Sequence, residues 1–235
     1  MIIDAILTPA EIDTLPQRNL GHAAAVVFDV LRATSTMLTA LAHGAHEIYP
    51  VRTIDEAFAL KKQMPDALLG GERHGERIEG FDLGNSPLEH CRELPPRIIT
   101  TTTNGTIALR ACDHAGAVLA GALLNMQALV AHLRSTPRCE IVLVCAGTFR
   151  DLAFEDVLAA GMLCAHFPAA EITDAARTAR TVFAEHERDI YAGLCAAKNG
   201  RVLLNKGREE EVRWCARVSQ LDIVGVLKDG AIRPH

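Results

Sequence analysis

The sequence lacks an excess of basic residues. Its 24 lysines and arginines are outnumbered by 29 aspartates and glutamates, which gives a net charge of −5 and a pI near 6.1. Nucleic-acid binding needs a basic face that neutralises several phosphates, so this composition argues against a general nucleic-acid-binding protein. An acidic protein that binds an anion must gather positive charge locally, from arginines, backbone N–H groups or a metal ion.

Paired cysteines and long apolar runs are also missing. The seven cysteines are irregularly spaced and form no CxxC pair, so we expect free thiols in a reducing compartment. The N-terminal stretch MIIDAILTPAEID has no basic region ahead of an apolar core and is not a signal peptide. No apolar run approaches the roughly 20 residues of a membrane-spanning helix. We therefore expect a cytoplasmic protein with no membrane partner.

Two common sets of motifs are absent as well. No GxGxxG follows the first expected strand, which argues against a dinucleotide-binding protein. The ten histidines show no HxH or HExxH spacing. Any metal site is therefore expected to use other ligands.

Short apolar runs alternate with amphipathic stretches over the first two thirds of the chain. The pattern predicts strands at 23–30, 47–51, 66–72, 97–102, 117–123 and 139–147. It predicts helices at 34–45, 53–64, 104–112, 125–135 and 154–167. Residues 171–217 are expected to be mostly helical, with short strands and turns at 201–207 and 221–235. This alternation indicates an α/β layered fold with a largely parallel sheet. No linker composition divides the chain, so residues 1–235 are expected to form a single domain.

Polar side chains follow the first of these predicted strands. Asp29 ends the strand and Arg32 lies in the turn, and three hydroxyl residues begin the next helix: Thr34, Ser35 and Thr36. Hydroxyls and free N–H groups at a helix start favour anions, and arginine suits phosphate or sulfonate. An ordinary helix cap beside a surface arginine is the alternative interpretation.

A glycine-rich loop at 70–87 is dense in polar residues. Its glycines permit backbone geometry closed to other residues and let a ligand approach closely. Charges of both signs could bind an anion and a hard cation together, whereas the alternative is a solvated surface loop. The candidate residues are Glu72, Arg77, Asp82, Asn85 and Ser86.

The stretch TTTNGT at 101–106 runs from a strand into a helix. Backbone N–H groups and short side chains in such a turn can cradle an anion. Asn104 and Gly105 are the candidates here, although similar turns also serve only as helix caps.

Two carboxylates, Glu155 and Asp156, stand in the first turn of the helix expected at 154–167. Carboxylates suit that end of a helix dipole, so capping is one interpretation. Together with Asp29 and Asp82 they could instead complete a magnesium site, because Mg²⁺ favours carboxylate oxygens and water.

Cys145 and Arg150 suggest the phosphate-binding loop of cysteine phosphatases. That loop has five residues between the cysteine and the arginine, whereas four separate them here. We therefore expect a packed thiol at Cys145 and keep a cysteine phosphatase as a rival hypothesis.

Five segments together resemble the 2-phosphosulfolactate phosphatase family, called ComB. They occur in the family's order and spread over most of the chain. They are DVLRATST (29–36), GERHGERIEGFDLGNSP (71–87), TTTNGT (101–106), CAGTFRDLAFEDVLAAG (145–161) and NGRVLLNKG (199–207).

The resemblance implies a magnesium-dependent phosphomonoesterase. The family's reaction hydrolyses 2-phospho-3-sulfolactate to 3-sulfolactate and phosphate, a step of coenzyme M biosynthesis. The family's fold is a three-layer α/β/α arrangement with a mixed, largely parallel sheet and an internal structural duplication. The expected partner is a small anionic phosphorylated substrate, and a homodimer is an assembly that could form.

The resemblance and the motifs together assign roles to the candidates. The expected catalytic residues are Asp29, Arg32, Glu72 and Asp82. The expected Mg²⁺ ligands are Asp29, Asp82, Glu155 and Asp156. The expected substrate-binding residues are Thr34, Ser35, Thr36, Arg77, Asn85, Ser86, Asn104 and Gly105.

Leu31 bears on the choice of nucleophile. Haloacid-dehalogenase phosphatases carry a second aspartate at this position, which protonates the leaving group. Its absence disfavours covalent attack by Asp29, so we prefer attack by a metal-bound water. Another small phosphomonoester as substrate, or a non-catalytic anion-binding protein, stays open as an alternative.

Overall fold

One mixed β-sheet forms the centre of the computed structural model, which describes residues 1–136 and 138–235. The strands within these ranges are β1 (Ile2–Ile6), β2 (Ala23–Phe28), β3 (Glu47–Pro50), β4 (Leu68–Arg73), β5 (Glu76–Arg77), β6 (Arg97–Thr101), β7 (Ala117–Gly121), β8 (Glu140–Cys145), β9 (Glu171–Ile172), β10 (Gly225–Lys228) and β11 (Ala231–Pro234). They pair in the order β5-β4-β6-β3-β11-β10-β7-β2-β8-β1-β9.

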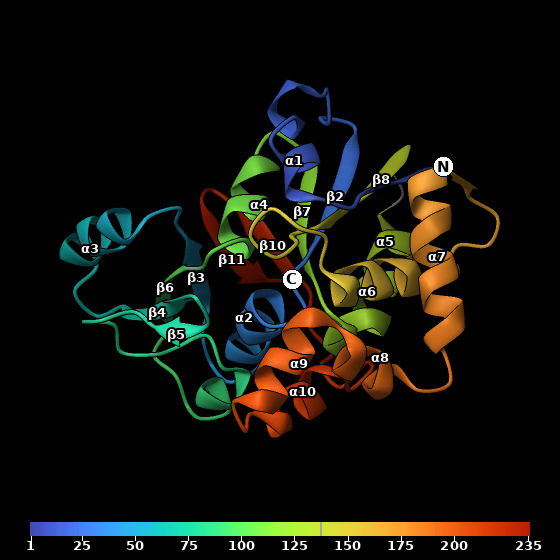
Figure 1. Cartoon of the computed structure of the whole chain (residues 1–235). Coiled ribbons are helices and arrows are strands. Elements are labelled where there is room, and N and C mark those ends of the chain that lie inside the picture. The colour runs from blue at the N-terminus through green and yellow to red at the C-terminus, as the bar shows by residue number, and fades with distance from the viewer. Residues whose placement is uncertain (137) are drawn as a thin grey trace.

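Helices cover both faces of this sheet. The α-helices of the described ranges are α1 (Pro9–Ile12), α2 (Ala33–Ala42), α3 (Ile54–Gln63), α4 (Gly105–Ala111), α5 (Met126–Ser135), α6 (Phe154–Ala165), α7 (Asp174–His186), α8 (Ile190–Ala196), α9 (Lys198–Asn205) and α10 (Glu209–Cys215). Short 3₁₀ helices are η1 (Leu15–Gln17), η2 (Pro87–His90) and η3 (Leu123–Asn125). Figure 1 shows α3 with β4 and β5 at one end of the molecule and α7 at the other.

The two-residue period of strand β2 explains the three layers. Ala24, Val26 and Phe28 point into a core that α5, α6 and α7 cover. The alternate residues of the same strand, Ala23, Ala25 and Val27, point into a second core beneath α1, α2 and α4. Because successive strand side chains face opposite ways, an all-apolar strand requires helices on both sides. The expected three-layer α/β/α fold is therefore confirmed.

Two groups of parallel strands make up the sheet. One contains β7, β2, β8, β1 and β9, and the other contains β3, β6 and β4. The antiparallel hairpin β10–β11 lies between them and pairs with β7 on one side and β3 on the other. The sheet is mixed and largely parallel, as expected. An internal duplication and a single domain stay predictions.

The predicted elements between residues 23 and 167 are confirmed to within a few residues, and strand β1 is an addition. The strand expected at 201–207 is wrong, because this segment belongs to helix α9 and the turn after it. Gly200 and Leu203 are buried while Val202 is 45% exposed, which is helical spacing and not strand alternation. Short strands are confirmed at the C-terminus, as β10 and β11.

Length and apolar character decide whether any helix of the described ranges could span a bilayer. None of them is long and apolar enough to cross a membrane.

Candidate active site

A pocket with a volume of about 200 Å³ opens where the segments after β2, β4, β6 and β8 meet helix α9. The convergence of strand ends matches the general rule for ligand sites in α/β sheets. Its lining residues are Asp29, Leu31, Arg32, Glu72, His74, Gly75, Asn85, Thr103, Asn104, Gly147, Thr148, Phe149, Lys198, Asn199, Val202 and Leu203.

Asp29 lies in this pocket directly after strand β2. Its Oδ1 accepts a hydrogen bond of 3.0 Å from the backbone N–H of Ala33 at the start of α2. Its Oδ2 lies close to Gly105 at the start of α4, where an added Cβ would stand only 2.6 Å from that oxygen. Gly105 therefore contributes room for the Asp29 carboxylate, whereas substrate contact by Gly105 stays a prediction.

The three hydroxyl residues at the start of α2 have partners within the protein. Thr34 Oγ1 donates to the Asp29 carbonyl at 3.0 Å, and Ser35 Oγ donates to the Val30 carbonyl at 2.8 Å. Thr36 Oγ1 donates to the Asn85 carbonyl at 2.9 Å. Thr34 and Ser35 thus shape the Asp29 turn and Thr36 ties α2 to the glycine-rich loop, and none of the three lines the pocket.

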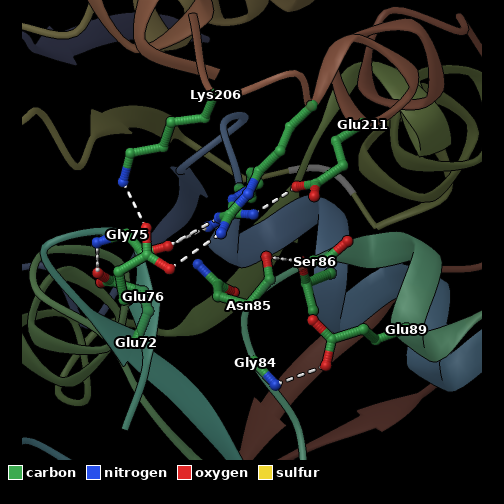
Figure 2. A network of polar contacts seen from close by, with 12 residues as sticks. Glu72, Gly75, Glu76, Gly84, Asn85, Ser86, Glu89, Lys206 and Glu211 are labelled. Carbon is green, nitrogen blue, oxygen red and sulfur yellow. Dashed lines mark hydrogen bonds and ion pairs between the residues drawn. The ribbon is translucent and has the colours of Figure 1, made fainter. Parts of the chain in front are cut away.

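Arg32 is buried at the edge of the pocket and forms an ion pair with Glu211 of α10. Its second terminal nitrogen donates to the Gly75 carbonyl at 3.2 Å, and Arg208 donates to the same carbonyl at 2.9 Å. Figure 2 shows Glu211 on one side of this network and Gly75 on the other. Glu211 therefore balances the charge of Arg32. Arg32 also holds Gly75 of the glycine-rich loop and lines the pocket.

The tip of the β4–β5 hairpin is tied to the segment before α10. Glu76 forms ion pairs with Lys206 at 2.5 Å and with Arg208 at 3.0 Å, as Figure 2 shows for Lys206. At the pocket mouth the ring of His74 lies 5.8 Å from that of Phe149. The glycine-rich loop therefore forms a wall of the pocket and is held by two cations.

Glu72 joins two of the loops that surround Asp29. Its Oε1 accepts hydrogen bonds from the N–H and the hydroxyl of Thr103, at 2.8 and 2.9 Å. Its Oε2 accepts from the N–H of Gly75 at 2.7 Å. Both oxygens are therefore occupied, and Glu72 organises the pocket wall. Its expected catalytic role stays a prediction.

Asn85 and Asn104 both line the pocket, as the glycine-rich loop and TTTNGT motifs predict. The Asn104 amide donates to the carbonyls of Ala146 and Phe149 and its oxygen accepts from the Phe149 N–H. This side chain connects the segment after β6 to the one after β8. Ser86 is buried just before η2 and is not among the lining residues.

Glu155 and Asp156 are each only 1% exposed in the first turn of α6. Asp156 accepts the N–H of Val30 at 2.8 Å and the N–H of Gly147 at 3.1 Å, so it fixes the turns after β2 and β8. Glu155 Oε1 accepts from Asn199 at 2.6 Å. Glu155 Oε2 is a buried oxygen with no hydrogen-bond partner.

Burial raises the pKa of the Asp29, Glu155 and Asp156 carboxyls, and charge repulsion adds to the rise at Asp29 and Asp156. The pKa of Asp29 rises from 3.8 to about 7, first through desolvation and then through the charges of Glu72 and Glu155. Desolvation raises the pKa of Glu155, and it raises that of Asp156 well above the ordinary value with added repulsion from Asp29 and Glu155. A cation placed among these groups would relieve the repulsion.

Asp82 and Arg77, two further predicted site residues, lie on the exposed part of the glycine-rich loop and do not line the pocket. Asp82 is exposed, and its Oδ2 accepts the backbone N–H of Leu69 at 2.8 Å. Arg77 is exposed on strand β5. The structure therefore does not bring Asp82 together with Asp29.

The described residues do not form a ready-made cage of three or more acidic, histidine or cysteine ligands. This agrees with Mg²⁺ chemistry, in which one or two carboxylates are supplemented by waters and substrate phosphate. The orphaned Oε2 of Glu155, in a cluster with the Asp29 carboxyl, is a donor set that fits such an ion.

Cys145 ends strand β8 and is fully buried. Desolvation, with repulsion from Asp156, raises the pKa of its thiol well above the ordinary value. A buried neutral thiol is a poor nucleophile, so the structure favours the packed thiol over the cysteine-phosphatase hypothesis.

Two pocket residues from α9, Lys198 and Asn199, are absent from the predicted site. Lys198 forms an ion pair with Asp151 at 3.0 Å, and Asn199 bonds to Glu155. The motif NGRVLLNKG begins at Asn199 and contained a signal for that residue, whereas Lys198 lies just before it. The signal was missed because the segment was interpreted as a strand, away from the site.

Desolvated carboxylates around a small pocket at the strand ends of an α/β/α sheet are typical of an enzyme active site. A family model described as 2-phosphosulpholactate phosphatase matches residues 7–230. The chain belongs to this family.

Individual relatives agree with the family match. The chain is 38% identical to proteins named "Probable 2-phosphosulfolactate phosphatase" from Clostridium perfringens and Carboxydothermus hydrogenoformans, with 99% of this chain and 96% of each relative covered. A protein of the same name from Deinococcus radiodurans is 38% identical over 93% of both chains. The family's name describes hydrolases of phosphoric monoesters.

Proposed function

We propose that this protein hydrolyses 2-phospho-3-sulfolactate to 3-sulfolactate and inorganic phosphate. The proposal rests on Asp29, which lines a pocket of about 200 Å³ and feels the charge of Glu155, a residue whose buried Oε2 has no hydrogen-bond partner. The family match and the names of the relatives support the substrate. The volume suits a three-carbon metabolite. In this proposal the reaction is a step of coenzyme M biosynthesis, and the cytoplasmic location and homodimer stay predictions.

The proposal includes Mg²⁺ as the cofactor. Asp29 and Glu155 would hold the ion, because they offer the carboxylate oxygens that lack a full set of protein donors. When bound, Mg²⁺ would neutralise phosphoryl charge and favour attack by water. Asp156 is not a ligand in this scheme, because both of its oxygens accept backbone N–H groups.

The protein's own residues position the substrate. A phosphomonoester dianion repels nucleophiles, so binding groups must hold it in line with the attacking water. Arg32, Asn85 and Asn104 line the pocket and offer donors for the substrate's anionic groups. Lys198 supplies a cation at the rim, where the sulfonate or carboxylate would displace Asp151 from its exposed ion pair.

Phosphate release from a panel of phosphomonoesters tests the proposal. The panel contains 2-phosphosulfolactate, phospholactate, phosphoglycolate and p-nitrophenyl phosphate, each with Mg²⁺ and with EDTA. We expect turnover that requires Mg²⁺ and prefers 2-phosphosulfolactate. Preference for another compound would identify a different substrate, and turnover that survives EDTA would contradict the metal.

Asp29→Asn is the matched variant for the same assay. Loss of a metal ligand should reduce turnover by at least the roughly 10–100-fold that loss of a ligand's hydrogen-bond partner costs, while the isosteric amide keeps the pocket filled. Asp82→Asn is the control, because Asp82 lies outside the pocket. Near-normal turnover of Asp29→Asn would remove Asp29 from the mechanism. Anion-dependent thermal stabilisation without turnover would indicate a binding protein.

A further inference from the structure

Asn199 connects three parts of the site through one amide group. Its Nδ2 donates to Thr148 Oγ1 in the segment after β8 and to Glu155 Oε1 in the first turn of α6, each at 2.6 Å. An amide nitrogen carries two hydrogens, so both are used. Asn199 itself comes from α9, 44 residues beyond Glu155 in the chain.

The asymmetry of the Glu155 carboxylate follows from this bond. Oε1 is held by Asn199, whereas Oε2 is buried and has no partner. A buried carboxylate with two free oxygens could rotate and present either of them to a ligand. With Oε1 fixed, Oε2 is the oxygen left for a ligand.

The start of α9 keeps Asn199 in place. A Cβ on the next residue, Gly200, would stand 1.8 Å from the Leu194 carbonyl oxygen of α8. The absence of that Cβ lets the backbones of α8 and α9 touch. This close contact sets how far the Asn199 side chain reaches towards α6.

We propose that Asn199 is a positioning residue for the divalent cation, because it turns the Glu155 carboxylate so that Oε2 faces the ion. The inference rests on the proposed function for the identity of the ligands. Hydrogen-bond partners of metal ligands commonly change metal affinity by roughly 10–100-fold when they are removed. The alternative is that Asn199 only ties α9 to α6 and contributes stability.

Mn²⁺ binding separates these two roles without any turnover. The free ion is counted by electron paramagnetic resonance during titration of the full chain, because bound and free Mn²⁺ differ in signal. The variants are Asn199→Ala and the shape-conserving Asn199→Leu. Asn205→Ala and Asn205→Leu are matched controls, since Asn205 is an exposed residue at the far end of the same helix.

We expect both Asn199 variants to bind Mn²⁺ roughly 10–100-fold more weakly and both Asn205 variants to bind as the wild type does. The Mg²⁺ concentration that half-activates phosphate release should rise by a similar factor, with turnover recovering at saturating Mg²⁺. If Asn199 only ties α9 to α6, its substitution would lower the melting temperature of the metal-free protein and leave Mn²⁺ affinity unchanged.

Unchanged affinity in either folded Asn199 variant would overturn the inference, and so would failure of the wild type to bind Mn²⁺. Wild-type protein that binds Mn²⁺ in an Asn199-dependent way but hydrolyses none of the phosphomonoesters would support the inference and refute the proposed function. The two proposals can therefore fail separately.

Discussion

At the scale of single residues, Asp29 shows how packing prepares a carboxylate for a cation. Its Oδ1 accepts a hydrogen bond from the Ala33 N–H, and its Oδ2 faces the space that Gly105 leaves open because it has no side chain. Burial first, and then the negative charges of Glu72 and Glu155, raise the pKa of this carboxyl to about 7. The metal-free carboxyl is therefore close to half protonated at neutral pH.

This raised pKa predicts a pH dependence of activity. We expect phosphate release to decline as the pH falls through about 7, because the protonated carboxyl of Asp29 binds no cation. Since Mg²⁺ and the proton compete for the same oxygens, a higher Mg²⁺ concentration should move the decline to lower pH. Rate profiles at two Mg²⁺ concentrations measure this. An identical midpoint at both concentrations would contradict the assignment of Asp29 as a ligand.

At the scale of elements, the sequence predicted what depends on local pattern. Strand β2 and helix α6 were predicted because the spacing of apolar residues and the helix-start signals are local features that span only a few residues. The same local signals placed Asp29 and Glu155 in one proposed site. Asp82 was misplaced because nothing in the sequence shows which end of the glycine-rich loop faces the pocket. Helix α9 was misjudged because the apolar run at 202–204 resembles a strand until the burial of Leu203 is known.

A substitution at Gly200 tests the close contact between α8 and α9. We expect Gly200→Ala to lower the free energy of unfolding by roughly 1–3 kcal/mol, the usual cost of overpacking, because its Cβ would meet the Leu194 carbonyl. It should also weaken Mn²⁺ binding by moving Asn199. Urea unfolding and Mn²⁺ titration measure the two effects.

Gly21→Ala is the control for that substitution, since its Cβ would meet no atom closer than 3.8 Å. Equal stability of the two variants would show that α8 can move away from α9 at little cost.

At the scale of the whole molecule, the two parallel strand groups meet at a narrow junction. Strand β11 pairs with β3 through one register pair, Ile232 with Ile48. Glu47 reinforces that junction, because its Oε1 accepts two hydrogen bonds from Arg233 of β11, at 2.7 and 3.0 Å. Its Oε2 accepts from Arg97 of β6 at 3.1 Å. One carboxylate thus connects three neighbouring strands.

Glu47 predicts how the junction responds to acid. Hydrogen bonds from Arg233 and Tyr49 lower its pKa from 4.5 to about 2. A carboxyl whose pKa is lower in the folded than in the unfolded chain stabilises the fold at pH values above its unfolded pKa, which is near 4.5 for Glu47. This contribution is lost as the pH falls towards 2. We expect Glu47→Gln to cost about 1 kcal/mol at pH 7, as for a well-formed but partly exposed ion pair, and progressively less below pH 4.5. Urea unfolding of this variant and of the exposed control Glu79→Gln measures both effects. A cost that stays constant from pH 7 to pH 3 would show that Glu47 stabilises the junction by packing and not by charge.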